Sequence, residues 1–239
     1  ASFIERPVDL IGHSFGAVVA LRLAVAAPEA IRSLTLIEPV LFAAAPQDGP
    51  EIAALRADQV RFEQLLAAGL AEDATQAFIE KWGVGWPWDK LPEAQRARFI
   101  TQIPMVAQAS QGNFADHGQI LRDGGIEMID APVMIVQGDQ SPEIIAPVCA
   151  AIAERCQDVA TATIPHAGHM LPLTHGTQLA FGRVLLDLKK IHVVQMRISE
   201  QTFHSVHRRC GNIRLREQRQ PLRAGARRER GFHFIVEFF

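Results

Sequence analysis

Near its beginning the chain carries the segment VDLIGHSFGA, residues 8–17. Its apolar first half favours a β-strand, and the small residues from Gly16 onward favour a helix that runs to Pro28. Between the two lies the pattern Gly-x-Ser-x-Gly, with glycines at positions 12 and 16 on either side of Ser14. These glycines allow a sharp turn that holds a serine in a strained conformation and exposes its hydroxyl. The segment therefore predicts that Ser14 is a catalytic nucleophile.

Other apolar runs indicate strands at residues 34–37, 133–136 and 159–164, separated by longer stretches with helical periodicity. This alternation predicts the α/β class, with a parallel sheet and flanking helices. Residues 42–124 show only helical and loop patterns, and we interpret them as an inserted helical cap.

Residues 8–17 and a late segment, IPHAGHM at residues 164–170, together resemble the α/β-hydrolase superfamily. The resemblance implies the order serine, acid, histidine along the chain, and it implies that His169 is the general base. A neutral imidazole can take the Ser14 proton and return it to the leaving group near neutral pH. The resemblance also implies that the Phe15 N–H, at the start of the helix, stabilises the oxyanion. His13 is treated as a neighbour of the nucleophile.

The acid that would orient His169 has two candidates. The superfamily usually has an aspartate three residues after the glycine that follows the strand predicted at residues 133–136. Here that glycine is Gly138, and Ser141 occupies the position of the aspartate. Asp139, directly after Gly138, is one candidate. Glu38, which ends the apolar run at residues 34–37, is the other, because some superfamily members carry their acid on that strand. Either carboxylate could fix the tautomer of His169, and both remain open.

The cap contains an aromatic cluster whose surroundings resemble the caps of hydrolases that act on small esters or on carbon–carbon bonds. Trp82, Trp86 and Met105 are the candidate substrate-binding residues. An apolar lid of this kind would exclude water and favour small apolar acyl groups. The alternative is that the tryptophans only hold the cap helices together.

The superfamily takes its second oxyanion donor from a loop far upstream of the nucleophile, whereas only a short lead precedes residue 8. The chain also begins with Ala1 rather than Met. We therefore expect the first half of the sheet to be missing and the chain to be a fragment. A former interior strand would then be an open edge, which favours a homodimer or aggregation of the fragment.

Charge is divided unevenly along the 239 residues, although the net charge is only −2. Residues 191–239 carry ten Arg and four Glu, which leaves a net charge of −8 on the rest of the chain. A body of this sign does not favour nucleic acid or an anionic membrane. The basic tail shows no periodic pattern, and we expect a disordered or out-of-frame extension.

Several classes of protein are disfavoured by the sequence. No apolar run reaches the roughly 20 residues of a membrane helix, and no leader is visible. Three cysteines form neither a disulfide framework nor a zinc pattern, so a cytoplasmic location is expected. No metal is expected, because His166, His169 and His175 have no carboxylate or thiolate at ligand spacing. No nicotinamide or flavin signature is present, so no cofactor is expected.

These observations predict a core with the nucleophile at residues 1–41, a helical cap at 42–124, a core with the acid and histidine loops at 125–190, and a basic tail at 191–239. The predicted function is that of an α/β-fold serine hydrolase with a small-molecule substrate, an apolar ester or related carbonyl compound, cleaved through an acyl-enzyme. The alternatives are an inactive truncated fragment and a carbon–carbon bond hydrolase of the same fold.

Overall fold

The computed structural model describes residues 6–176, 196–197 and 233–236. Within these residues a sheet of six strands has the order β5-β4-β3-β2-β1-β6. The strands are β1 (Val8–His13), β2 (Ile31–Ile37), β3 (Val133–Gly138), β4 (Val159–Ile164), β5 (Met196–Arg197) and β6 (His233–Val236). All neighbouring pairs are parallel except β4 and β5, which are antiparallel. The parallel sheet predicted from the alternation of apolar runs is thus confirmed.

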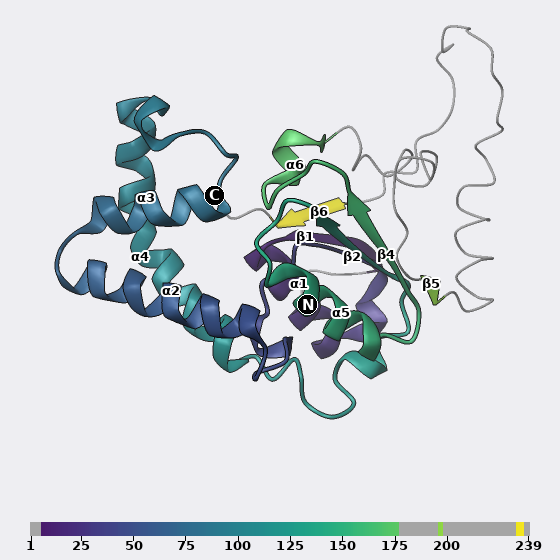
Figure 1. The fold of residues 1–239 in the computed structure, drawn as a ribbon. Coiled ribbons are helices and arrows are strands. Elements are labelled where there is room, and N and C mark those ends of the chain that lie inside the picture. Colours follow the sequence, from purple (N-terminus) through teal and green to yellow (C-terminus); the bar gives the residue numbers. More distant parts are fainter. Residues whose placement is uncertain (1–5, 177–195, 198–232, 237–239) are drawn as a thin grey trace, which may run out of the picture.

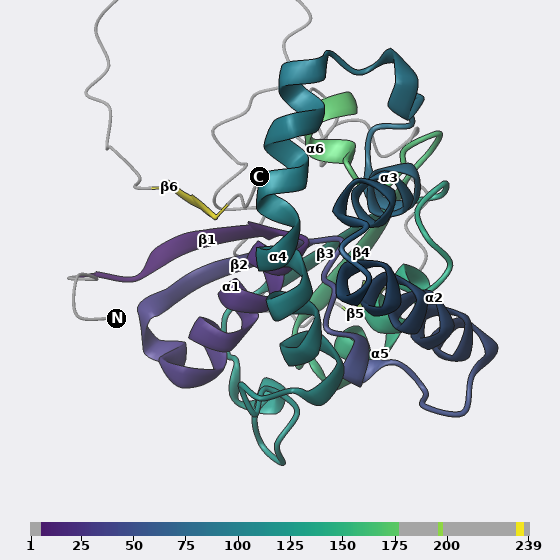
Figure 2. The same cartoon turned by 90° about the vertical axis from the view of Figure 1, so that its left-hand side faces the viewer.

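Two helices cover one face of this sheet, as Figures 1 and 2 show. They are α1 (Phe15–Ala26), which contacts β1 and β2, and α5 (Ile145–Arg155), which contacts β3 and β4. Leu10, Leu34 and Ile135 point to this face and belong to the larger buried apolar cluster. Their sequence neighbours Ile11 and Val136 belong to a smaller cluster with Leu171 of α6 (Leu171–Thr174). This alternation is the period of two that a strand imposes on its side chains.

Three long helices lie between β2 and β3 in the chain and fall within the predicted cap, residues 42–124. They are α2 (Pro50–Ala67), α3 (Ala71–Trp82) and α4 (Glu93–Ala115). In Figure 1 they lie to the left of the sheet, on the side toward which β6 points, and β6 runs parallel to β1. They therefore stand at the carboxyl ends of the parallel strands, where open α/β sheets usually bind ligands.

Short 3₁₀ turns connect these elements, namely η1 (Pro28–Ala30), η2 (Phe42–Ala44), η3 (Trp88–Lys90) and η4 (Ile126–Met128). No helix among the described residues has the length and apolar character needed to cross a membrane.

The edge of the sheet at β1 differs from the expectation. We predicted that a former interior strand would be left as an open edge, but β6 pairs with β1 in parallel, with Asp9 opposite His233 and Gly12 opposite Val236. An unpaired strand edge offers free N–H and C=O groups to any extended segment within reach, and here a segment of the tail takes that place. Apart from β5 and β6, the predicted tail at residues 191–239 lies outside the described residues.

Candidate active site

Ser14 lies at the turn between β1 and α1. Its φ of 55° is in the left-handed region, which is costly for a residue with a side chain. The turn also requires Gly12, because a Cβ there would lie 2.3 Å from the Gly16 oxygen and 2.6 Å from the Ala17 Cα. The Ser14 N–H donates to the Ile37 oxygen of β2 over 2.9 Å, which fixes the turn to the neighbouring strand. The strained serine between two close-packed glycines is thus present as the sequence pattern describes.

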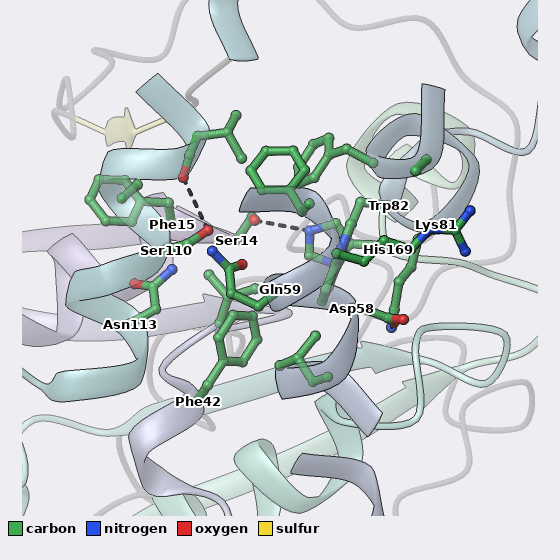
Figure 3. A pocket seen from close by; sticks show the side chains of 18 of the residues that line it. Ser14, Phe15, Phe42, Asp58, Gln59, Lys81, Trp82, Ser110, Asn113 and His169 are labelled. Atoms are coloured by element: carbon green, nitrogen blue, oxygen red, sulfur yellow. Dashed lines mark hydrogen bonds and ion pairs between the residues drawn. The ribbon is translucent and has the colours of Figure 1, made fainter. Parts of the chain in front are cut away.

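His169 lies in the loop between β4 and α6, and its ring is buried. Its Nε2 is 2.9 Å from Ser14 Oγ, and its Nδ1 is 3.0 Å from Glu38 Oε2. An ionised carboxylate only accepts hydrogen bonds, so Nδ1–H donates to Glu38 and Nε2 is left to accept from the Ser14 hydroxyl. The three side chains form one chain of hydrogen bonds, part of which is drawn in Figure 3.

Glu38 directly follows β2, has a φ of 50° and is 0% exposed. Its second oxygen, Oε1, accepts from the Gly138 N–H over 2.6 Å and from the Ser141 hydroxyl over 2.7 Å. A buried carboxylate is tolerated only where hydrogen bonds replace its lost hydration. Glu38 has three such bonds, and all three donors come from the carboxyl ends of β3 and β4 or the loops that follow them.

The two candidate acids lie in different surroundings. Among the described residues, the carboxylate that contacts His169 is that of Glu38, whereas Asp139 is exposed. The reason is local: Gly138 turns its N–H toward Glu38, and the Asp139 N–H then bonds to the Ile164 oxygen of β4 over 3.2 Å. The chain is thereby held along β4 while the Asp139 side chain lies in solvent.

Within the described part of the chain, two rings pack against the imidazole of His169. The ring of Trp82 meets it edge-on with 4.8 Å between centroids, and His13 lies 5.0 Å away on a tilted plane. His13 Nε2–H donates to the His169 carbonyl oxygen over 2.8 Å. Burial, together with the nearby His169, lowers the pKa of His13 from 6.5 to about 4. A neutral His13 therefore holds the backbone of the histidine loop in place.

A cavity of about 540 Å³ opens above Ser14 and His169. Its walls come from η2 and the three long helices, and they are largely apolar, including Phe42, Phe62 and Phe78. Trp82 and Met105, two of the predicted substrate-binding residues, line this cavity, as does Phe15. Trp86 does not: it lies in the loop after α3, is 61% exposed and is absent from the cavity wall. Helix α3 ends at Trp82, so the chain has already turned away from the cavity when it reaches Trp86.

Several residues of the site were not identified from the sequence. Ser141 was noted only as a departure from the superfamily pattern, yet its hydroxyl contacts Glu38. Gln59 of α2 and Ser110 and Asn113 of α4 bring polar groups to the cavity wall, as Figure 3 shows. The paired ions Asp58 and Lys81 also lie on this wall. The spacing of these residues along their helices would identify them as cavity-lining residues only if the face of each helix that points to the cavity were known.

The other histidines of the late segment lie apart from the site. His166 is exposed, and His175 shares a hydrogen bond with its neighbour Thr174. The described residues contain no group of three or more His, Cys, Asp or Glu side chains arranged to hold a metal ion.

The family of the protein follows from comparison with known proteins. The model of the alpha/beta hydrolase family matches residues 1–180, so the chain belongs to this family. No curated protein matches the chain.

Solved structures of similar fold include three hydrolases. The first is 2-hydroxy-6-oxo-6-phenylhexa-2,4-dienoate hydrolase from Rhodococcus sp. strain RHA1, with 18% identity, a TM-score of 0.53, and coverage of 76% of this chain and 63% of that chain. MGS-M2, an alpha/beta hydrolase enzyme from a Medee basin deep-sea metagenome library, has 17% identity, a TM-score of 0.56, and coverage of 82% and 68%. A hydrolase from Oleispira antarctica has 17% identity, a TM-score of 0.52, and coverage of 75% and 64%.

At these identities the likeness shows the fold alone. The match also spans only 63% of the length of the Rhodococcus enzyme.

Proposed function

We propose that this protein is a serine hydrolase in which Ser14 is the nucleophile, His169 the general base and Glu38 the acid. The observation that supports the proposal most strongly is the continuous hydrogen-bond chain, 2.9 Å from Ser14 Oγ to His169 Nε2 and 3.0 Å from His169 Nδ1 to Glu38 Oε2. Both distances lie within the reach that proton transfer from a nucleophile to its base requires.

In the first half of the reaction, Ser14 Oγ attacks the carbonyl carbon of an ester while its proton passes to His169 Nε2. The charge of Glu38 stabilises the imidazolium that forms, and its hydrogen bond keeps Nδ1 protonated. The tetrahedral intermediate carries a negative oxygen at the amino end of α1. There the Phe15 N–H and the helix dipole favour negative charge.

The intermediate then collapses as the bond to the alcohol oxygen breaks. The alcohol leaves with the proton from His169, and an acyl group stays on Ser14. Water attacks this acyl-enzyme, gives its proton to His169 Nε2 and releases the carboxylic acid, while the proton returns to Ser14 Oγ. These steps use only the three side chains, the backbone N–H and water.

The cavity supports a small, mainly apolar substrate. Phe42, Phe78, Trp82 and Met105 surround the space above Ser14, and a cavity of about 540 Å³ is within the usual range for small-molecule sites. The helices that form its walls exclude water from the acyl-enzyme except at the opening.

Turnover of a series of p-nitrophenyl esters, from acetate to octanoate, tests the proposal. We expect hydrolysis by the 239-residue chain, best with short and medium acyl groups, and its loss in Ser14→Ala. Ser110→Ala is the matched control, since Ser110 lines the same cavity but donates to the Val106 oxygen rather than to a histidine. Full hydrolysis by Ser14→Ala, or equal loss in both variants, would overturn the proposal.

A further inference from the structure

Helix α4 presents one face to the cavity above Ser14. The residues that line the cavity follow the three- and four-residue spacing of a single helix face, and they are Gln102, Met105, Val106, Ala109, Ser110 and Asn113. The middle of this face is apolar, with Gln102 at its amino end and Ser110 and Asn113 toward its carboxyl end. In Figure 3, Ser110 and Asn113 lie on one side of Ser14 and His169 lies on the other.

Asn113 is buried and its amide oxygen is not satisfied; Gln102 Oε1 also has no partner among the described residues, but Gln102 is only half-buried. Asn113 is 5% exposed, and its Oδ1 has no hydrogen-bond partner among the described residues. Most buried side-chain polar atoms are hydrogen-bonded, because an unsatisfied buried acceptor is costly. A side chain that bears such a cost on the wall of a cavity is suited to a hydrogen bond from a ligand.

The side chains around Asn113 indicate which chemical groups of a ligand could bind there. The Ser110 hydroxyl, one turn earlier on α4, donates to the Val106 oxygen over 3.0 Å and therefore keeps its lone pairs as acceptors. Two aromatic rings lie near Asn113. Phe114 is its neighbour in the chain, and the ring of Phe114 packs on that of Phe42, a residue of the cavity wall, with 5.0 Å between centroids. Among the described residues, the ionisable side chains of the cavity wall other than His169 come from α2 and α3, and they are Asp58, Arg61, Glu80 and Lys81. The end of α4 thus offers uncharged acceptors beside aromatic rings, and the neighbouring polar side chain, Gln59, is also uncharged, as Figure 3 shows.

An uncharged hydroxyl group fits this place best. A keto or carboxylate oxygen only accepts hydrogen bonds and would leave Asn113 Oδ1 unpaired. An ammonium group would enter an apolar corner without a counter-charge, which is costly. A hydroxyl can donate to Oδ1 and accept from the amide N–H, and its neutral charge requires no partner.

We propose that Asn113 is a substrate-binding residue that accepts a hydrogen bond from a hydroxyl group on the acyl part of the substrate, so that the preferred substrates are hydroxylated esters. This assignment rests on the proposed function, which places the carbonyl group at Ser14.

Binding of two uncleaved esters tests the assignment independently of turnover. Isothermal titration of ethyl 3-hydroxybutyrate and ethyl butyrate into the Ser14→Ala variant compares ligands that differ by one hydroxyl. We expect the hydroxylated ester to bind about tenfold more tightly. In Ser14→Ala/Asn113→Leu the preference should reverse, because the hydroxyl then loses its partner while the apolar ester gains an apolar wall.

The control is Ser14→Ala/Gln108→Leu, since Gln108 lies on α4 but is exposed and absent from the cavity wall. It should keep the preference of its Ser14→Ala parent. A reversal is a readout that poor folding cannot produce, because poor folding weakens both ligands together. The same affinity ratio in Ser14→Ala and in Ser14→Ala/Asn113→Leu, or no binding of either ester, would overturn the assignment.

The two proposals fail in different ways. Preferred binding of the hydroxylated ester by a protein that does not hydrolyse esters would keep the Asn113 site and overturn the proposed hydrolase. Hydrolysis that is lost in Ser14→Ala, together with a preference for the hydroxylated ester that does not change in Asn113→Leu, would keep the proposed hydrolase and overturn the Asn113 site.

Discussion

Glu38 and His169 are 131 residues apart in the sequence, yet Glu38 Oε2 and His169 Nδ1 lie 3.0 Å from each other. Glu38 follows β2 and His169 follows β4, and the strand between them, β3, and its following loop supply the groups that bind the other carboxylate oxygen. Parallel strands end at the same edge of the sheet, so three loops converge on one carboxylate. The position of the Glu38 carboxylate is therefore a property of the sheet order.

Replacing Glu38 by Gln removes the charge of the acid while keeping its size. We expect the rate of ester hydrolysis to fall about 10²- to 10⁴-fold, because the amide neither stabilises the imidazolium nor fixes the His169 tautomer. Asp139→Asn should stay within about twofold of the parent, since Asp139 is exposed. Steady-state kinetics on one p-nitrophenyl ester measures both, and a larger loss in Asp139→Asn than in Glu38→Gln would refute the assignment.

Ser141→Ala should lower the free energy of unfolding by about 1.5–3 kcal/mol, the range for a hydrogen bond to a charged group. The loss is large because the partner, Glu38, is 0% exposed and water cannot replace the hydroxyl. Ser33 gives a matched comparison, because its hydroxyl also donates to a carboxylate, that of Asp9, but near the surface and beside Arg32. Urea denaturation should show a smaller loss for Ser33→Ala; the reverse order would contradict the role of Ser141.

The buried His13 makes stability depend on pH. The pKa of His13 is about 4 in the folded protein, whereas the ordinary pKa of a histidine, 6.5, applies to the unfolded chain. As the pH falls, the unfolded chain therefore binds a proton at this residue before the folded protein does. Stability from this residue is therefore complete above about pH 6.5 and is lost as pH falls toward 4. We expect a loss on the order of 2 kcal/mol between about pH 7 and about pH 5.

The variant His13→Gln isolates this effect, because a glutamine can donate to the His169 oxygen but does not titrate in this range. Urea denaturation at both pH values should show a smaller pH dependence in the variant than in the parent. Equal slopes in the two proteins would rule out His13 as the cause.

Gly12→Ala should prevent the turn at Ser14 from forming, because the new Cβ would overlap the backbone of Gly16 and Ala17. Gly112→Ala is the matched control: Gly112 lies within α4, and a Cβ there meets nothing within 4 Å. Alanine should stabilise that helix by up to about 1 kcal/mol. Thermal unfolding followed by circular dichroism should separate the two, and a Gly12→Ala protein as stable as its parent would contradict the geometry of the turn.

The sequence predicted the strand, turn and helix around Ser14 because each carries a local signal. Glycine spacing, an apolar run and a small-residue helix are all visible within residues 8–27. The position of His169 after an apolar run is also visible locally, but its role as the base came from the resemblance to the superfamily. The choice between Glu38 and Asp139 could not be made in this way, because it depends on how β3 and β4 hold the loop after Gly138.

Long-range pairing was the least predictable part of the fold. The end of the tail is apolar, but its composition did not indicate that His233–Val236 would pair with β1, since the pairing of a short edge strand depends on which partner strand is exposed. The cavity wall could be predicted in part from the sequence. The apolar and aromatic residues of the cap were visible, but which of them face Ser14 depends on helix rotation, and so Trp82 was separated from Trp86 only by the structure.

Labelling with a fluorophosphonate, followed by mass spectrometry to locate the adduct, tests most directly whether Ser14 is an activated nucleophile. The reagent reacts with serines that an adjacent base activates, and it needs no knowledge of the substrate. We predict one adduct on Ser14, lost in His169→Ala and retained in Ser110→Ala. An adduct on Ser110, or labelling of Ser14 that is unchanged in His169→Ala, would contradict the proposed triad.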